Sequence, residues 1–416
     1  MRQHELRHKI IEEMHLRRWP RLKSPGNVVQ IVRVLDNQER EEESRYLAET
    51  LPAAGIAYSP SARHVSGNYA EAITFAWERH TEGSSITVFD STPEGGDQAL
   101  AARHWAEDFP GRVVRATRIS VVADEAEAES ILPRLDFSRD DLVSCRILGR
   151  LRMWSDFQLH EEGFGRLVIA ANGADPATLS RAIQQLQELG NYRNMALLGL
   201  PEVREQWNEL DQIESQLRQF AIDVGDDSMR DDVLLERVSE VAGHLATLSN
   251  RIGYRLNATR AYAKLVDERL EDLQPEAIES YYTLAHFIRR RFLPAVRTCD
   301  SHRERLDQIN ARTGDLASLL RARISTRIEN QNAQLLESLE RRAEVQLRLQ
   351  QLVEGLSIFA LAYYGVGLVG YVLGAVAHFV EIPSTNVIMG VSVPVVMVTI
   401  WLMARHLKRR ILGKPH

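Results

Sequence analysis

Residues 355–380 read GLSIFALAYYGVGLVGYVLGAVAHFV and contain no aspartate, glutamate, lysine or arginine. A helix of about 20 apolar residues is long enough to cross the roughly 30 Å hydrocarbon core of a bilayer. A second run without these four residue types follows at 382–404. The two runs predict transmembrane helices at 355–380 and 387–404, joined by a short external loop at 381–386. A buried helix pair of a soluble protein is the alternative interpretation.

Basic residues flank the two runs and predict their orientation. Arg341, Arg342 and Arg348 precede the first run, a basic tail at 405–416 follows the second, and the loop between them has no lysine or arginine. Positively charged flanks stay on the cytoplasmic side of a membrane. Because the first twenty residues also lack the apolar segment of a signal peptide, we expect both termini in the cytoplasm.

The overall composition is that of a folded chain. The protein has 416 residues, of which 44% are hydrophobic and 26% charged, and its formal net charge is −6. These values exclude a disordered or collagen-like chain, and the mildly acidic balance indicates no nucleic-acid partner. The two cysteines, Cys145 and Cys299, exclude a disulfide framework and suit a reducing compartment.

Hydrophobic periodicity divides the part of the chain before the apolar runs into three segments. Taken together, the segments predict an α+β fold. Residues 1–175 mix strand and helix periods, which predicts a cytosolic α/β sheet domain. Residues 176–300 predict a cytosolic domain of antiparallel long helices. Residues 301–354 predict a stalk helix that continues into the first span. Leucine and isoleucine recur along this stalk every three, four or seven residues, which favours coiled-coil packing in a homo-oligomer.

Several individual elements follow from the same patterns. Strands are expected at 28–35, 73–77, 86–89 and 113–122, and a meander at 143–148, 151–159 and 166–170. Helices are expected at 37–51 and 97–108, and a long one that opens within residues 229–232 and runs to about Leu273. The next helix is expected to start at Pro275, because proline is favoured at the first helical position.

Four stretches carry a resemblance to a known family. They are residues 13–20 (EMHLRRWP), 77–82 (WERHTE), 192–201 (YRNMALLGLP) and the segment from 341–343 (RRA) through 353–357 (VEGLS). In these stretches the chain resembles an uncharacterised family of bacterial membrane-anchored proteins, defined as a domain of unknown function. The likeness spans nearly the whole chain and implies the bacterial inner membrane, but no activity. The family usually has His-Ala-Arg-Pro where this chain reads HLRR at 15–18.

The order of the predicted elements is also similar to that of CorA-type divalent cation channels. This resemblance implies a homopentamer whose first span lines a pore, with a divalent cation such as Mg²⁺ as its ion. CorA proteins carry a Gly-Met-Asn triplet at the outer end of that span. This chain reads AHFVEIPSTN at 377–386 instead, which puts magnesium selectivity in doubt.

The first function hypothesis is therefore an oligomeric cation channel or transporter. Small residues let helices approach closely in lipid, and the same face can line a pore. A ring of carboxylates at the outer mouth would attract cations. The candidate residues are Gly367, Gly370, Gly374 and His378 on one helix face, with Glu381 and Asn386 at the outer mouth. Simple helix packing, an interfacial glutamate and a helix cap are the alternative roles.

The second hypothesis is a membrane-anchored cytosolic sensor or scaffold without transport. Polar residues gather beside the tight turn expected after the strand at 73–77, and the N-terminal family motif adds two more. The candidates are His15, Arg17, Trp77, Glu78, Arg79, His80 and Glu82. Such a cluster can bind a ligand or an ion. The alternative is a hydrogen-bonded hairpin end that fixes domain packing.

Catalysis is not expected. The sequence has no convincing nucleophile–base pair, phosphate-binding loop or metal-ligand set. No catalytic residue or metal ligand is assigned, and the cofactor is undetermined apart from the divalent cation implied by the CorA resemblance. The expected partners are the lipid bilayer and further copies of the chain.

Overall fold

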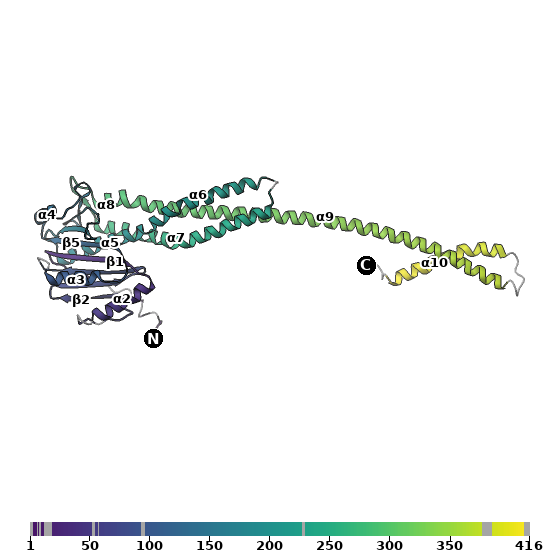
Figure 1. Ribbon diagram of the computed structural model, residues 1–416, viewed down its shortest axis with the longest axis horizontal. Helices are drawn as coiled ribbons and strands as arrows, with labels where there is room; N and C mark the ends of the chain where they lie inside the picture. Colours follow the sequence, from purple (N-terminus) through teal and green to yellow (C-terminus); the bar gives the residue numbers. More distant parts are fainter. Residues whose placement is uncertain are drawn as a thin grey trace. The chain divides into compact units, whose positions relative to one another are not determined.

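Figure 1 shows a computed structural model of the chain. The structure describes residues 3–5, 7, 10–11, 19–51, 55–56, 58–92, 96–226, 229–376 and 385–411. The chain divides into two compact units, Met1–Ser318 and Leu319–His416.

Among its described residues, the first unit contains one mixed sheet of nine strands in the order β2-β3-β4-β1-β5-β8-β7-β6-β9. Neighbouring strands are antiparallel except β5 and β8, which run parallel. The strands are β1 (Gly26–Val34), β2 (His64–Ala70), β3 (Ile73–Arg79), β4 (Gly83–Asp90), β5 (Arg112–Val122), β6 (Val143–Ile147), β7 (Leu151–Ser155), β8 (Gly165–Ala170) and β9 (Glu276–Ala277).

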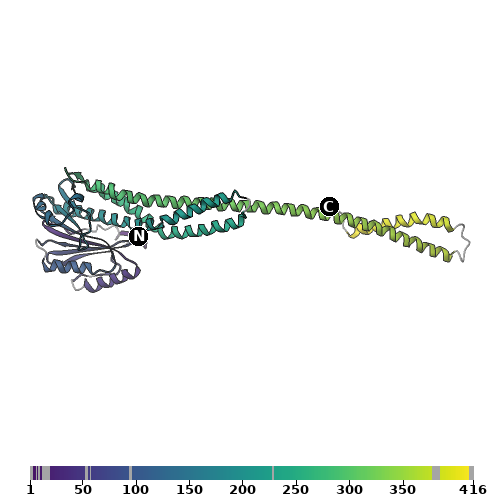
Figure 2. The same cartoon turned by 45° about the horizontal axis from the view of Figure 1, so that its top comes forward.

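Helices cover both faces of the sheet and continue beyond it. Figure 2 shows α2 and α3 on one side of the sheet and teal α5 on the other. The helices are α2 (Asn37–Thr50), α3 (Asp97–Glu107), α4 (Glu125–Ile131), α5 (Pro176–Leu197), α6 (Gly199–Asp223), α7 (Asp231–Leu273), α8 (Leu284–Phe287), α9 (Leu293–Val376) and α10 (Thr385–Ile411). Short 3₁₀ turns lie at Leu132–Arg134 and Arg139–Asp141, and a π-helical turn at Ile288–Phe292 joins α8 to α9.

The first core lies between the sheet and helices α2 and α3. Side chains alternate across a strand, so Phe75 and Trp77 of β3 point to the same face, where Leu47 of α2 and Ala102 of α3 pack against this core. Helix α2 begins where it does because Asp36 caps it. The Asp36 carboxylate accepts from the Glu39 backbone amide, and the Glu39 side chain accepts from the Asp36 amide.

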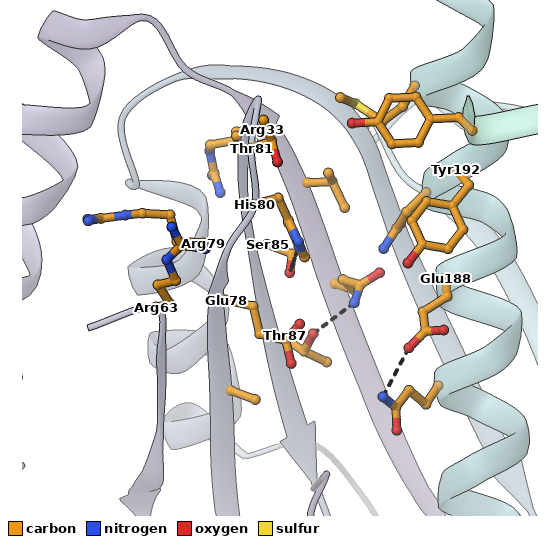
Figure 3. Close-up of a pocket in the computed structure, with 18 of the residues that line it drawn as sticks. Arg33, Arg63, Glu78, Arg79, His80, Thr81, Ser85, Thr87, Glu188 and Tyr192 are labelled. Atoms are coloured by element: carbon orange, nitrogen blue, oxygen red, sulfur yellow. Dashed lines mark hydrogen bonds between the residues drawn. The ribbon is translucent and has the colours of Figure 1, made fainter. Parts of the chain in front are cut away.

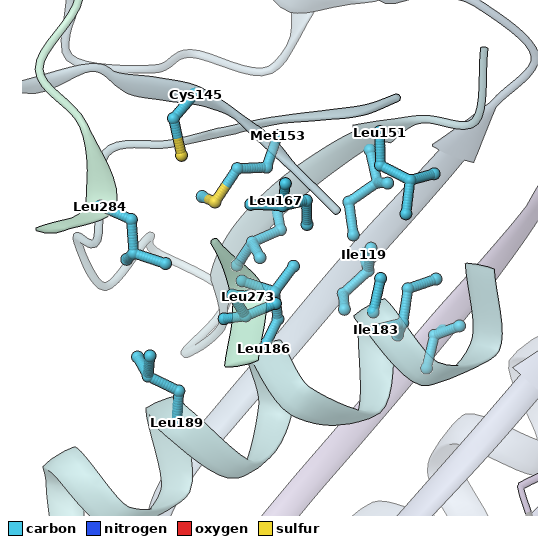
Figure 4. Close-up of a cluster of buried hydrophobic side chains, with 14 of the residues drawn as sticks. Ile119, Cys145, Leu151, Met153, Leu167, Ile183, Leu186, Leu189, Leu273 and Leu284 are labelled. Carbon is cyan, nitrogen blue, oxygen red and sulfur yellow. The ribbon is translucent and has the colours of Figure 1, made fainter. Parts of the chain in front are cut away.

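The second core lies on the opposite face, beneath α5 (Figure 4). Ile119 of β5 and Leu167 of β8 pack against Ile183 and Leu186 of α5, and Leu273 at the end of α7 joins them. Helix α5 starts sharply because the Asp175 side chain accepts hydrogen bonds from two backbone amides of the first turn and a proline follows it. This start places α5 across the middle of the sheet.

A third core joins α6, α7 and the first part of α9. Leu210 of α6, Leu245 and Leu248 of α7, and Leu306 and Ile309 of α9 are all buried in it. Each helix has its apolar residues at spacings of three or four, so each presents one apolar stripe to the others.

The second unit contains the remainder of α9 and helix α10. The continuous helix Leu284–Val376 and the segment Val387–His406 are both long and apolar enough to cross a membrane. A Cβ atom added at Gly365 would lie 2.8 Å from Val396 Cγ1, and one at Gly370 would lie 2.7 Å from Met389 Cε. The two helices therefore approach each other closely at these glycines.

The α+β prediction is confirmed, with the sheet first, long helices after it and an apolar helix at the C-terminal end. The expected helices at 37–51 and 97–108 correspond to α2 and α3, and the helix expected to open within residues 229–232 corresponds to α7. The strands expected at 28–35, 73–77, 86–89 and 113–122 are present as β1, β3, β4 and β5. The meander β6-β7-β8 is present in the predicted order.

Three local predictions are wrong. No helix starts at Pro275: Gln274 adopts a left-handed conformation that ends α7, and β9 then pairs with β6 at the sheet edge. The strand expected at 151–159 ends at Ser155, because the Asp156 carboxylate accepts from the Gln158 amide and turns the chain. The stalk helix starts before residue 301, since α9 begins at Leu293.

Candidate functional site

A polar cavity of about 290 Å³ lies between the sheet and helix α5 of the first unit (Figure 3). We call it the α5 cavity. Strand alternation explains its polarity: Glu78, Ser85 and Thr87 are the neighbours in sequence of the core residues Trp77, Ile86 and Val88 and so face the other way. The side chains that define the cavity are Gln30, Glu78, His80, Ser85 and Thr87 from the sheet side, and Gln184, Glu188, Asn191 and Tyr192 from α5, with Tyr262 of α7.

The sheet side of the α5 cavity is held by hydrogen bonds between neighbouring strands. Gln30 Nε2 donates to Thr87 Oγ1 at 3.0 Å, which links β1 to β4. His80 Nε2 lies 3.0 Å from Ser85 Oγ across the β3–β4 turn. Glu78 Oε1 lies 4.0 Å from His64 Nδ1 of β2. These contacts orient the polar groups before any ligand is present.

The helix side carries a half-buried carboxylate and two tyrosines. Arg269 Nε lies 2.8 Å from Glu188 Oε2, and Gln184 Nε2 donates to Glu188 Oε1 at 3.0 Å. Burial raises the pKa of Glu188 in spite of these partners. Tyr192 and Tyr262 stack with ring centroids 6.0 Å apart.

Both tyrosines of this stack keep their protons. Burial raises the pKa of Tyr262 to about 12 and also raises the pKa of Tyr192. At neutral pH both hydroxyls are therefore available as hydrogen-bond donors. The α5 cavity thus offers carboxylate acceptors and hydroxyl donors to a small polar molecule, and its volume is near the lower end for ligand sites.

The residues that the structure describes include no group of three or more histidine, cysteine, aspartate or glutamate side chains placed to hold a metal ion.

The residues of the predicted cluster at 77–82 lie on both faces of the sheet. Glu78, Arg79 and His80 line the α5 cavity. Trp77 lies on the opposite face of the sheet, where its Nε1 donates to Glu43 Oε1 at 3.1 Å. The Arg79 guanidinium also turns toward α2, because its Nη2 donates to Ser44 Oγ at 2.9 Å.

Glu82 binds helix α7 instead of the cavity. Its side chain is buried and contacts Arg255 and Tyr254. His15 and Arg17, the two N-terminal members of the predicted cluster, lie outside the described residues.

The candidate residues predicted in and beside the two apolar helices have different surroundings. Gly370 faces Met389 of α10, whereas a Cβ at Gly367 or Gly374 would meet no atom of the described residues within 4 Å. Asn386 lies in the first turn of α10. His378 and Glu381 lie outside the described residues.

Sequence reasoning missed the helix side of the cavity and Gln30. One signal was available for Gln30, which interrupts the apolar run of β1. Glu188 and Tyr192 lie one helical turn apart and so share a face of α5, but the sequence does not say what that face covers.

The model of one protein family, described as "Protein of unknown function (DUF3422)", matches residues 2–411. No curated protein and no solved structure matches the chain. The CorA resemblance therefore rests on the order of the elements alone.

Proposed function

Because the chain belongs to the DUF3422 family, whose function is unknown, we propose a function from the geometry of its cavity. The protein is a membrane-anchored sensor whose sheet unit binds a small polar ligand in the α5 cavity. One observation carries this proposal: polar side chains from three strands and from helices α5 and α7 converge on a single hollow. Ligand sites in proteins are typically hollows in which a few polar groups from several elements converge.

The two apolar helices support the membrane anchor. The outer surface of α9 and α10 carries exposed apolar side chains such as Phe359, Leu368, Val391 and Leu402, which water solvates poorly. In this proposal the protein is anchored in a bacterial inner membrane, and by the positive-inside rule the sheet unit and both termini lie on its cytoplasmic side. Alkaline carbonate should leave the protein in the membrane fraction and detergent should release it. Reporter fusions after His416 and in the loop 381–386 test the orientation.

Ligand binding is tested on the full-length protein in detergent. Thermal unfolding is measured with amino acids, polyols and nucleosides. These compounds carry N–H or O–H groups that can donate hydrogen bonds to the carboxylates of Glu78 and Glu188. We expect one class to raise Tm in a concentration-dependent way, as a ligand of the folded state must. If no class raises Tm, the sensor proposal fails.

A matched pair of variants locates the effect. Glu78→Gln removes a cavity carboxylate and should weaken the ligand's affinity about tenfold, since a hydrogen bond to a charged group contributes on the order of 1.5–3 kcal/mol. Glu71→Gln makes the same change at an exposed residue between β2 and β3 and should leave affinity unchanged. Equal affinity in wild type and Glu78→Gln would place the ligand elsewhere.

An oligomeric cation channel of the CorA plan is the second candidate. Gly367 and Gly374 supply its specific observation, because no described residue of the same chain packs against either, which leaves a small-residue surface for other copies. In this proposal the first span lines the axis of a five-subunit ring and Glu381 lies at the outer mouth. Cation flux into liposomes tests it. Glu381→Gln should lower flux most at low ionic strength, where screening is weakest.

A further inference from the structure

Two arginines of the first unit, one buried and one half-buried, have no carboxylate partner among the described residues. Arg115 of β5 is 8% exposed, and its Nη1 donates to Gln30 Oε1 at 3.2 Å and to Asn191 Oδ1 at 2.8 Å. Among the described residues, Arg193 of α5 donates to Asn194 Oδ1 alone, at 3.4 Å. The Arg193 Nη1 atom is buried and donates to none of the protein atoms that the structure describes.

Aromatic rings take the place of a counter-ion at Arg193. Its guanidinium carbon lies 4.9 Å from the ring centroid of Phe157 and 5.5 Å from that of Phe287. Ring faces attract a cation, but they do not accept the hydrogen bonds of a planar guanidinium edge. The edge that carries Nη1 is therefore left for another acceptor.

Burial acts against both charges. Burial, together with the nearby charge of Arg193, lowers the pKa of Arg115 to about 9, and burial lowers the pKa of Arg193 to about 10. No carboxylate counteracts these shifts. Buried charges in proteins are normally paired, because an unpaired one is costly to desolvate.

A second hollow of about 260 Å³ lies beside these two side chains. We call it the arginine cavity. It is lined by Arg115, Arg193 and Asn194, by Thr117 of β5 and by Ser155 and Gly165 beside the loop between β7 and β8. It differs from the α5 cavity, with which it shares none of these residues.

The backbone keeps room for the Arg115 charge. A Cβ atom at Gly190 of α5 would lie 2.6 Å from the Arg115 guanidinium carbon, well inside van der Waals contact. Any side chain at position 190 would therefore push the guanidinium from its place. The helix approaches β5 closely at this point because residue 190 is glycine.

We propose that the arginine cavity binds a small oxyanion, the carboxylate or phosphate group of a ligand, between Arg115 and Arg193. The guanidinium group presents parallel N–H donors that match the oxygens of both groups. Such an anion supplies the missing acceptor for Arg193 Nη1 and the missing negative charge for the pair. The inference does not depend on a ligand in the α5 cavity.

The test uses full-length protein in detergent at constant ionic strength, with chloride replaced stepwise by inorganic phosphate or by acetate. We expect saturable binding of one of them in calorimetry and a rise in Tm of about 4 °C at saturation. A response to phosphate alone assigns a phosphate ligand, and a response to acetate alone assigns a carboxylate. If neither anion binds the wild-type protein at millimolar concentration, the proposal is overturned.

Variants show where the anion binds. Arg193→Met keeps the volume of the side chain and removes its charge, so it should lose the anion-dependent rise in Tm while its Tm in chloride does not fall. Arg118 lies in β5, as Arg115 does, but its guanidinium lies over the Phe164 ring and outside the arginine cavity. Arg118→Met should therefore keep the anion-dependent rise in Tm. An unchanged anion response in Arg193→Met would overturn the assignment.

Discussion

Arg255 of α7 donates from Nη1 to Glu82 Oε2 at 2.6 Å, and the Tyr254 hydroxyl donates to Oε1 of the same carboxylate at 3.2 Å. Glu82 lies in the turn between β3 and β4, and its side chain is only 8% exposed. The pair therefore joins the end of two strands that border the α5 cavity to a helix far away in sequence. Glu82, which the sequence placed in a candidate ligand-binding cluster, therefore holds the β3–β4 turn against α7.

Arg255→Met should lower the free energy of unfolding by about 3 kcal/mol, because it leaves the Glu82 carboxylate buried without its charged partner. Chemical denaturation of the full-length protein in detergent measures this change. The double variant Arg255→Met/Glu82→Gln removes the stranded charge as well and should recover part of the loss. Equal stabilities of the single and double variants would contradict a buried ion pair.

The close contact at Gly83 gives a second prediction. A Cβ atom there would lie 1.7 Å from the carbonyl oxygen of Arg33, in the β1–β4 pairing. Because a backbone atom cannot move aside cheaply, Gly83→Ala should destabilise the protein by about 3 kcal/mol or more. Thermal unfolding followed by circular dichroism measures the effect.

Gly243 provides the matched control for this substitution. It lies exposed in α7, and an added Cβ would meet no atom within 4 Å. Gly243→Ala should raise the free energy of unfolding by up to about 1 kcal/mol, since alanine favours a helix over glycine. If both alanine variants lower stability alike, the contact at Gly83 is not the cause.

The sequence predicts elements better than it predicts their partners. The alternation of Ile73, Phe75 and Trp77 suffices for a strand, and it also implies that Glu78 faces the other side. No local pattern states that α5 covers that side, because the contact joins segments distant in the chain. The α5 cavity could therefore be found only in part, on its β3 side.

Edge strands were the elements that local patterns missed. Strand β2 mixes glycine, serine and asparagine with few apolar residues, and β9 has only two residues that pair with β6. Both exist because a neighbouring strand offers unpaired backbone groups, which is a tertiary effect and leaves no periodicity. The same effect overrode the helix-start signal of Pro275.

Glu43 of α2 gives a prediction of pH dependence. Its carboxylate is fully buried, with Oε1 accepting from Trp77 Nε1 and from Ser84 Oγ and Oε2 having no partner. Burial raises its pKa above the usual 4.5, so the folded state takes up the proton more readily than the unfolded state. The stability contributed by protonated Glu43 is thus complete below about pH 4.5 and is lost as the pH rises through the raised pKa.

Glu43→Gln should therefore be more stable than wild type at pH 7 and equal to it near pH 4, because glutamine keeps the acceptor oxygen and carries no charge. Tm measured across this pH range tests the difference. Glu43→Ala loses both hydrogen bonds and should be less stable than wild type by about 2 kcal/mol near pH 4, and this gap should narrow toward pH 7, where wild type bears the cost of the buried charge. A constant difference between Glu43→Gln and wild type would contradict the buried ionisation.

The glycines of the first apolar helix give the last prediction, within the second unit. A Cβ at Gly365 would lie 2.8 Å from Val396 Cγ1, whereas one at Gly367 would meet nothing within 4 Å. Gly365→Leu should separate α9 from α10 and destabilise their packing by about 2 kcal/mol, as overpacking does in a filled interface. Gly367→Leu should leave this packing intact. The temperature at which each variant loses its monodisperse peak in detergent distinguishes them, and equal losses at both positions would show that the chain's own helix pair does not set the constraint.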